Sequence, residues 1–389
     1  MNNQRIYLDY AATTPVDERV LQSMLPYFRE EFGNPSSIHR GGQVAEAILD
    51  ESREMVANVL NCKFEEVIFT SCGSESDNLA LRGVAFAMRR KRNANHILIS
   101  PVEHHAVLHT AQQLSELHSF ELEFLPVDQY GRVDPEKVAQ RIRPDTALVS
   151  IIYANNEIGS INPISEIGSI CRKFCVPFHT DAVQAASYLT LDVEELQVDL
   201  LSIGAHKFYG PKGIGALYIR KETPILPIQT GGSQEFGLRA GTHNIPYIVG
   251  LANALKWAQT ERIAHGELLT PMRDHIIGQI LEEITNSHLT GHPHIRLPNH
   301  ISFVFPNIDG NNLLRMLDMA GFACSSGSAC KTGNPEPSEV LTACGLSPEL
   351  ALGSLRVTLG KYTTAEEIDS FLLNLPYILQ KAQVLSLNI

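Results

Sequence analysis

Short apolar runs rich in β-branched residues alternate with stretches of helical spacing over most of this chain, from about residue 16 to about residue 256. Each run is apolar at nearly every position, which is typical of strands buried on both faces. Between the runs, apolar residues such as Ile48, Met55 and Val59 recur at helical spacing. The alternation predicts an α/β fold with a mostly parallel sheet covered by helices. The expected strands are 67–69, 96–99, 148–152, 176–178, 200–203 and 216–219.

The pattern changes after Ile245, where a long helical stretch is expected to continue to about Ile284. Short strands at 301–305 and 355–358, mixed with helices, then predict a smaller α+β domain. The chain has 389 residues, 44% of them hydrophobic, and exceeds the size at which a single core usually stops growing. We therefore expect a large domain and a small one, with an N-terminal segment that associates with the small domain. The expected boundaries are 1–14, 15–258 and 259–389.

The charge balance excludes several classes of partner. A formal net charge of −12 repels nucleic acid and anionic membrane surfaces, so a small molecule is the expected ligand. The one basic run, Arg89–Arg92, ends a helical pattern, where cations complement the helix dipole. No apolar run is long enough for a membrane span. The seven cysteines are scattered without a C-x-x-C pair, which indicates reduced thiols and a cytoplasmic protein.

A candidate phosphate site follows the strand at 67–69. The next residues lead into a helical pattern in which Ser74 and Asp77 make a capping-box signature. Amides at Gly73 and Ser74, together with the positive end of the helix dipole, could hold a dianionic phosphate. Taken alone, the simpler interpretation is a capped helix that binds nothing.

An acid and a lysine end two neighbouring predicted strands. Asp181 follows an apolar strand, and the next strand, which starts near Asp199, leads to Lys207. A pyridoxal cofactor requires this pair, because a lysine amine forms an imine with its aldehyde and a carboxylate keeps its ring nitrogen protonated. Burial would also lower the pKa of the lysine and free its amine. A lone lysine at a strand end is usually a surface residue, but Ser202 and His206 lie close by in the sequence.

Three further observations bear on the ligand. The glycine-rich loop at 210–215 matches neither nucleotide-binding motif, so nucleotide binding is not supported. His104 follows a strand and could stack on the cofactor or transfer protons; the adjacent His104 and His105 rarely converge on one ion, so no metal is expected. Asn155, in a polar cluster that ends an apolar strand, is a candidate contact to the cofactor's ring oxygen and to the substrate.

Together, these motifs resemble the cysteine desulfurases of the NifS/IscS type, within the class V aminotransferase-like fold, which is fold type I of the enzymes that use pyridoxal 5'-phosphate (PLP). The resemblance spans essentially the whole chain and implies a seven-stranded type of sheet in the large domain. The matching stretches are 7–14, 33–39, 103–105, 154–157, 202–207, 238–242, 325–330 and 355–356.

The resemblance implies a role for each matching residue. Lys207 is the imine lysine, Asp181 the partner of the ring nitrogen, Gln184 the contact to the ring oxygen, and His104 the stacking acid or base. A homodimer is implied, because Thr242 is expected to reach the cofactor phosphate of a second subunit. The other implied contacts are Gly73, Ser74, Ser202 and His206 to the phosphate, Arg356 to the substrate carboxylate, and Asn34 and Asn155 to the amino acid.

The resemblance further assigns Cys330 as the sulfur acceptor, which takes sulfur from L-cysteine as a persulfide and leaves L-alanine. A Gly/Ser-rich loop around Cys330 would let the thiol reach both the cofactor and an outside protein acceptor, such as an iron–sulfur scaffold. Lys331, Cys72 and Phe236 depart from the pattern of the family.

Two alternatives remain open at this point. One is another pyridoxal reaction, such as selenocysteine lysis or transamination, which would have no use for Cys330 and would survive Cys330→Ser. The other is a non-catalytic protein with the same fold, which would be colourless when purified.

Overall fold

The computed structural model describes residues 5–327 and 336–386. Its centre is a seven-stranded sheet with the order β2-β8-β7-β6-β5-β3-β4. The strands from β4 to β7 are parallel, and β8 runs antiparallel to both β7 and β2, so the predicted mostly parallel sheet is confirmed. The strands are β2 (Val67–Thr70), β3 (His96–Ile99), β4 (Glu121–Phe124), β5 (Thr146–Ser150), β6 (Phe178–Asp181), β7 (Leu200–Gly204) and β8 (Gly215–Ile219).

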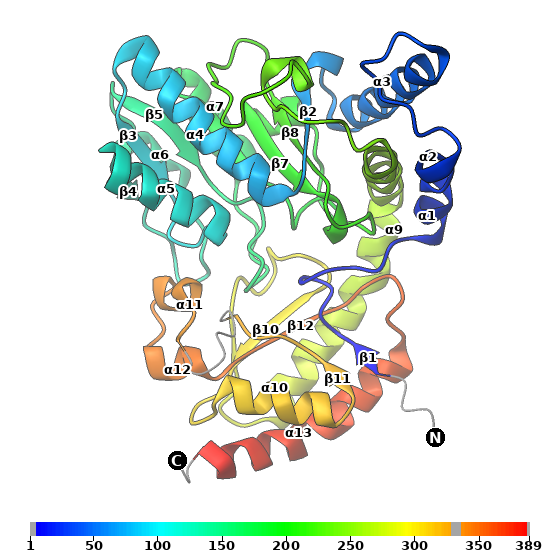
Figure 1. The fold of residues 1–389 in the computed structure, drawn as a ribbon. Helices are drawn as coiled ribbons and strands as arrows, with labels where there is room; N and C mark the ends of the chain where they lie inside the picture. Colours follow the sequence, from blue (N-terminus) through cyan, green and yellow to red (C-terminus); the bar gives the residue numbers. More distant parts are fainter. Residues whose placement is uncertain (1–4, 328–335, 387–389) are drawn as a thin grey trace.

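Helices cover both faces of this sheet (Figure 1). Successive side chains of a strand point to opposite faces, so Phe69 enters one core and Ile68 the other. The core around Ile68 is closed by α4 (Gly73–Arg92) and α5 (His105–His118). The core around Phe69 is closed by α1 (Glu18–Met24), α3 (Arg40–Leu60), α6 (Pro135–Arg141), α7 (Ile164–Lys173), α8 (Val193–Leu196) and the first part of α9 (Ile245–Glu283). The short α2 (Pro26–Arg29) contacts α1 and α9.

The small domain has a core of its own. Its three-stranded antiparallel sheet places β10 (His300–Val304) between β9 (His288–Leu289) and β12 (Ser354–Thr358). The N-terminal strand β1 (Ile6–Tyr7) pairs in parallel with β11 (Phe322–Ala323). This core is packed by α10 (Gly310–Met319), α13 (Ala365–Ser386) and the second part of α9. Two short helices, α11 (Glu339–Ala343) and α12 (Pro348–Leu352), pack with Val102, Ile152 and Ile158 of the large domain.

Helix α9 contributes to both cores. Its residues 245–258 pack in the large domain and its residues 269–280 in the small one, and Figure 1 shows the helix running from one domain to the other. The division expected after residue 258 falls inside this helix and stays a proposal. The described residues also form three short 3-10 turns, at Phe64–Glu66, Ala205–Lys207 and Glu235–Gly237.

Two expectations need correction. The strand expected at 176–178 begins at Phe178 and continues to Asp181, because the amide of Val176 is bonded to Cys171 O at the end of α7 and Pro177 has no amide hydrogen to donate to the sheet. Strand β4 was not expected, since Glu121 and Glu123 make it polar at an edge of the sheet.

The structural interpretation of the basic run Arg89–Arg92 is confirmed. The run ends α4, and the guanidinium of Arg89 lies 3.5 Å from the ring centroid of Phe120. Within the described ranges, no helix combines the length and the apolarity needed to cross a bilayer.

Candidate active site

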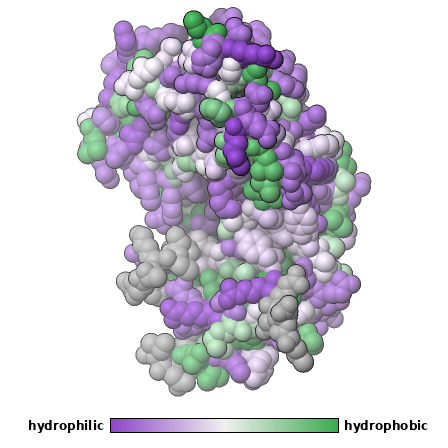
Figure 2. Space-filling view, turned by 45° about the vertical axis from the view of Figure 1, so that its right-hand side comes forward, coloured by the Kyte–Doolittle hydropathy of each residue, from purple (hydrophilic) through white to green (hydrophobic). Residues whose placement is uncertain are grey.

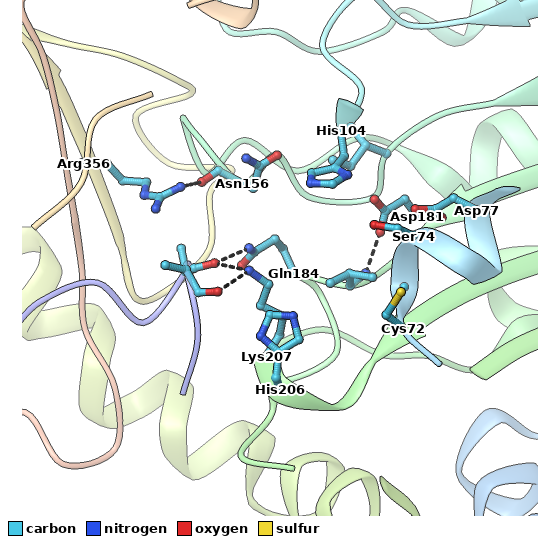
Figure 3. A pocket seen from close by; sticks show the side chains of 15 residues that line it. Cys72, Ser74, Asp77, His104, Asn156, Asp181, Gln184, His206, Lys207 and Arg356 are labelled. Atoms are coloured by element: carbon cyan, nitrogen blue, oxygen red, sulfur yellow. Dashed lines mark hydrogen bonds between the residues drawn. The ribbon is translucent and has the colours of Figure 1, made fainter. Parts of the chain in front are cut away.

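A cavity of about 250 Å³ opens at the carboxyl ends of β6 and β7, where ligands bind in sheets of this type (Figure 3). Asp181 is the last residue of β6, and Lys207 ends the 3-10 turn that follows β7. Arg356 enters the cavity from β12 of the small domain. The structure therefore brings together residues that lie far apart in the sequence. The predicted residues that line the cavity are Gly73, Ser74, His104, Asp181, Gln184, His206, Lys207 and Arg356.

The amine of Lys207 is held by backbone carbonyls of the N-terminal segment. Its Nζ donates to Ala11 O at 2.5 Å and to Ala12 O at 2.7 Å, and Gln184 Nε2 donates to the same Ala11 O at 2.8 Å (Figure 3). Burial, assisted by the charge of Arg356, lowers the pKa of Lys207 to about 8. A free amine is therefore accessible close to neutral pH.

The opposite end of the cavity is acidic. Asp181 Oδ1 accepts a hydrogen bond from Val183 N at 2.9 Å, and burial raises the pKa of Asp181. Behind it lies Asp77, 1% exposed, whose Oδ1 has no hydrogen-bond partner among the described residues. His179 Nε2 is 3.6 Å from that oxygen, but burial lowers the pKa of His179 to about 3 and keeps its ring neutral. Two carboxyl groups without a fixed cation need a proton or a positively charged ligand.

His104 lies beside these acids. Its Nδ1 accepts a hydrogen bond from Ala106 N at 3.1 Å, which caps α5 and leaves Nε2 as the protonated nitrogen of the neutral ring. Desolvation lowers the pKa of His104, although the ring is open to the cavity. One ligand atom each from Asp77, His104 and Asp181 lie within 4.8 Å of one another, a grouping that could also hold a metal ion.

The first turn of α4 forms another wall. The capping box expected from Ser74 and Asp77 is wrong: the N-cap is Cys72, which makes no side-chain capping bond, and Asp77 is turned into the buried acidic end. The first amides of the helix are thus left without a side-chain cap. Gly73 packs tightly on Val183, since a Cβ at position 73 would come within 2.7 Å of Val183 Cγ2. This wall can accept an anion.

Arg356 is already engaged on the small-domain side. Its Nη2 donates to Asp9 Oδ1 and its Nη1 to Asn156 O, both at 2.9 Å, while its Nε has no partner in the described part of the chain. Arg356 also lines a neighbouring cavity of about 290 Å³, together with His104, Asn156 and Glu157.

Several predicted residues are not in the lining of the cavity. Asn155 is buried, donates to Val102 O at 2.8 Å and accepts from the amides of Glu157 and Ile158, so it shapes the turn that presents Asn156. Ser202 is also buried, and its Oγ lies at hydrogen-bond distance, 2.9 Å, from His179 Nε2. The remaining three are Asn34 and Thr242, which are both exposed, and Cys330, which lies outside the described residues.

Other lining residues were missed by the reasoning from sequence. Asp77 was interpreted as part of a cap, although an acid one turn into a helix that starts at a strand end could equally have indicated a buried partner for Asp181. Asn156 lines the cavity, whereas the sequence reasoning selected its neighbour Asn155. The carbonyls of Ala11 and Ala12 carry no side-chain signal, and Asp9 stood in the matching stretch 7–14 without a role.

The sequence matches the family model described as "Aminotransferase class-V" over residues 6–371. It is also 48% identical to "Cysteine desulfurase IscS" of Dictyoglomus turgidum over 98% of this chain and 96% of that protein. The chain belongs to the cysteine desulfurases of this family. The cysteine desulfurases are PLP-dependent, and so is this chain.

Further relatives agree with this assignment. "Cysteine desulfurase IscS" of Methanosarcina thermophila is 47% identical over 99% of this chain and 94% of that protein. A solved "NIFS-LIKE PROTEIN" superposes with a TM-score of 0.90 at 39% identity, over 97% of this chain and all of that one. A structure titled "SspA in complex with cysteine" superposes with a TM-score of 0.78 at 35% identity, over 92% of this chain and all of that one.

The residues of the cavity fit the PLP of this family. Its walls carry an amine of lowered pKa, a buried pair of acids with no fixed cation beside it among the described residues, and a helix start without a side-chain cap. They suit an aldehyde, a protonated ring nitrogen and a phosphate, respectively.

Proposed function

We propose that this chain removes the sulfur of L-cysteine, releases L-alanine and holds the sulfur as a persulfide on Cys330 for delivery to a protein acceptor. The observation that supports this most is the placement of the Lys207 amine and the Asp181 carboxylate at the ends of neighbouring strands in one cavity. We also propose a cytoplasmic location, supported by the scattered cysteines.

Bound PLP supplies an electron sink for the bonds around the substrate's α-carbon. In our proposal Lys207 provides the amine that holds it, and Asp181 keeps its ring nitrogen protonated, with Asp77 as a second acid behind. The first-turn amides at Gly73 and Ser74, with His206, would hold its phosphate. Burial lowers the pKa of His206 to about 4, so its ring is neutral and can donate one hydrogen bond. Gln184 lies close enough to Lys207 to share the Ala11 carbonyl.

Arg356 is the proposed partner of the substrate carboxylate. It presents a planar guanidinium to the cavity, and its Nε has no hydrogen-bond partner among the described residues. Substrate binding would replace Asp9, which Nη2 of Arg356 binds, with the carboxylate of cysteine, which a planar guanidinium can bind through two donors. In our proposal His104, whose neutral ring carries its proton on Nε2, gives a proton to the substrate from that atom.

Cys330 is the proposed nucleophile. Its thiolate attacks the substrate sulfur: an S–S bond forms, the C–S bond of the substrate breaks, and the β-carbon takes up a proton as alanine leaves. Cys324 is the nearest alternative in sequence. It is disfavoured, because burial raises its pKa far above neutrality and keeps the thiol protonated.

A homodimer is part of the proposal. Thr242 and Asn34 are exposed and do not line the cavity of their own subunit, as expected for residues that act across an interface. The segment that carries Asn34 also holds Phe32 and Ile38, which are 75% and 95% exposed. Figure 2 turns the side with α1 to α3 forward and shows apolar patches on an otherwise hydrophilic large domain. A second copy of the chain would cover such side chains.

The proposal is tested by Cys330→Ala. The variant should keep the visible absorbance of bound PLP, because Cys330 is not among the proposed cofactor contacts, but it should form no persulfide and almost no alanine from cysteine. Cys324→Ala is the matched control and should remain active. Alanine production at the wild-type rate by Cys330→Ala would favour the alternative of selenocysteine lysis or another pyridoxal reaction.

A further inference from the structure

Glu235 is buried in a segment that is otherwise open to solvent. It is 4% exposed, whereas Phe236 and Gly237, which follow it, are exposed and Gln234, which precedes it, is half-buried. Its φ is 48°, and φ stays positive at Phe236 (55°) and Gly237 (79°). Two L-residues in succession in the left-handed region are costly, so contacts elsewhere must hold this turn in place.

The contacts that hold the turn converge on the Glu235 carboxylate. Arg53 of α3 binds it with two hydrogen bonds, Nη1 to Oε2 at 2.7 Å and Nη2 to Oε1 at 2.9 Å. Phe69 N donates to Oε2 at 2.8 Å, and His243 Nε2 lies 2.9 Å from Oε1. Burial alone would raise the pKa of Glu235, but the hydrogen bonds from Arg53, with His243 close by, hold it below its usual value. The buried pair is thus charged and fully engaged.

This ion pair also closes an edge of the central sheet. Arg53 Nη1 donates to Val67 O at 2.5 Å, so the pair satisfies both a carbonyl and an amide of β2, the edge strand. Phe236, which departs from the family pattern, covers the pair: its ring centroid lies 5.1 Å from the guanidinium of Arg53. Strand β2 leads directly to Gly73 and the first turn of α4, the proposed phosphate wall.

A second ion pair joins the segment that carries Glu235 to the first turn of α4. Arg239 Nε donates to Glu75 Oε1 at 2.8 Å, and Glu75 Oε2 accepts from Ser71 N at 2.5 Å. The base of the segment is closed by Gln229 Nε2, which donates to Ala240 O at 2.7 Å. Thr242, exposed, follows this closure by two residues. Segment 229–242 is therefore fastened to both β2 and α4, with Thr242 at its outer end.

We propose that Glu235 is a positioning residue for the cofactor phosphate, which it serves by fixing segment 229–242 so that Thr242 is presented to the cavity of the neighbouring subunit. The inference rests on the proposed function, specifically on the cross-subunit contact of Thr242. Glu235 itself touches no ligand. Its effect on cofactor retention must therefore pass through Thr242.

The test measures how fast bound PLP is lost from the holoenzyme, followed by its visible absorbance in the presence of a carbonyl scavenger. Glu235→Gln keeps the shape of the side chain and removes its charge, and loss of such a supporting contact should speed release about tenfold. Glu121→Gln is the control: Glu121 also forms a bidentate pair, with Arg143 at 2.6 and 2.8 Å, but on β4 at the opposite edge of the sheet. It should release PLP at the wild-type rate.

The double variant Glu235→Gln/Thr242→Ala separates positioning from a general loss of stability. If Glu235 acts through Thr242, the double variant should release PLP no faster than Thr242→Ala alone, whereas independent effects would multiply. Multiplied effects, or unchanged release from Glu235→Gln when Thr242→Ala is fast, would overturn the inference and leave the proposed function intact.

If Thr242→Ala releases PLP at the wild-type rate, Thr242 makes no cross-subunit contact with the phosphate. That result would overturn the inference as well. Should Glu235→Gln fail to fold, Arg239→Gln carries the same comparison at a pair that is only partly buried. Faster release that disappears in the Thr242→Ala background supports the role, and unchanged release contradicts it.

Discussion

The two walls of the cavity differ in how their charges are balanced. On the large-domain wall, Lys207 and Asp181 are desolvated, and neither forms an ion pair among the described residues. On the small-domain wall, Arg356 already pairs with Asp9 at 2.9 Å. The first wall is thus prepared to receive a charged cofactor, because its groups gain partners on binding. In our proposal, the second wall exchanges the Asp9 carboxylate for that of the substrate when L-cysteine binds.

The substitution Lys207→Ala, on the large-domain wall, should have the largest effect on activity. We expect alanine formation to fall by more than about a thousandfold, since a covalent catalyst loses its reactive group. Lys212→Ala is the matched control, because Lys212 is exposed in the following loop, and it should retain activity. The rate of alanine formation from L-cysteine is the measurement, and turnover by Lys207→Ala at even a tenth of the wild-type rate would refute the role.

The pH dependence of cofactor uptake tests the desolvation of the large-domain wall. Only the neutral amine of Lys207 reacts with an aldehyde, and burial lowers its pKa from 10.5 to about 8. The rate of PLP uptake by the cofactor-free protein should therefore rise about 50-fold between pH 6 and pH 8 and level off above pH 9. A rate that keeps rising to pH 10 would mean that the lysine is solvated.

Arg356→Ala tests the small-domain wall. Loss of the guanidinium should raise KM for L-cysteine by about 10- to 100-fold, the cost of charge-assisted hydrogen bonds, with a smaller change in kcat. The pH midpoint of PLP uptake should also move upward, because the charge of Arg356 helps to lower the pKa of Lys207. Steady-state kinetics with an unchanged KM would exclude Arg356 as the carboxylate partner.

Asp9→Asn should have the smallest effect. If Asp9 occupies the place of the substrate carboxylate, removal of its charge should lower KM by about two- to fivefold, the value of a partly exposed ion pair. A raised KM would show that Asp9 orients Arg356 and does not compete with the substrate.

The two walls also differ in how far the sequence revealed them. Asp181 and Lys207 could be predicted, because each ends an apolar strand and the carboxyl ends of parallel strands meet. Arg356 and Cys330 were assigned only by resemblance, since no local pattern marks a residue that depends on the packing of one domain on another. The mostly parallel sheet was predicted from apolar runs, whereas β4 was missed because its side chains are polar at an exposed edge.

The buried polar contacts were the least predictable part of the site. Asp77 is one turn inside a helix, and only the tertiary packing turns it toward Asp181. The Arg53–Glu235 pair joins residues 182 positions apart, and no spacing rule connects them.

Reductive trapping tests the central claim most directly. The holoenzyme is treated with borohydride, digested with a protease and analysed by mass spectrometry for a lysine that carries the reduced cofactor. We expect the modification on Lys207, with none on Lys212. Modification of another lysine, or no modified peptide from a protein that was yellow before treatment, would contradict the account.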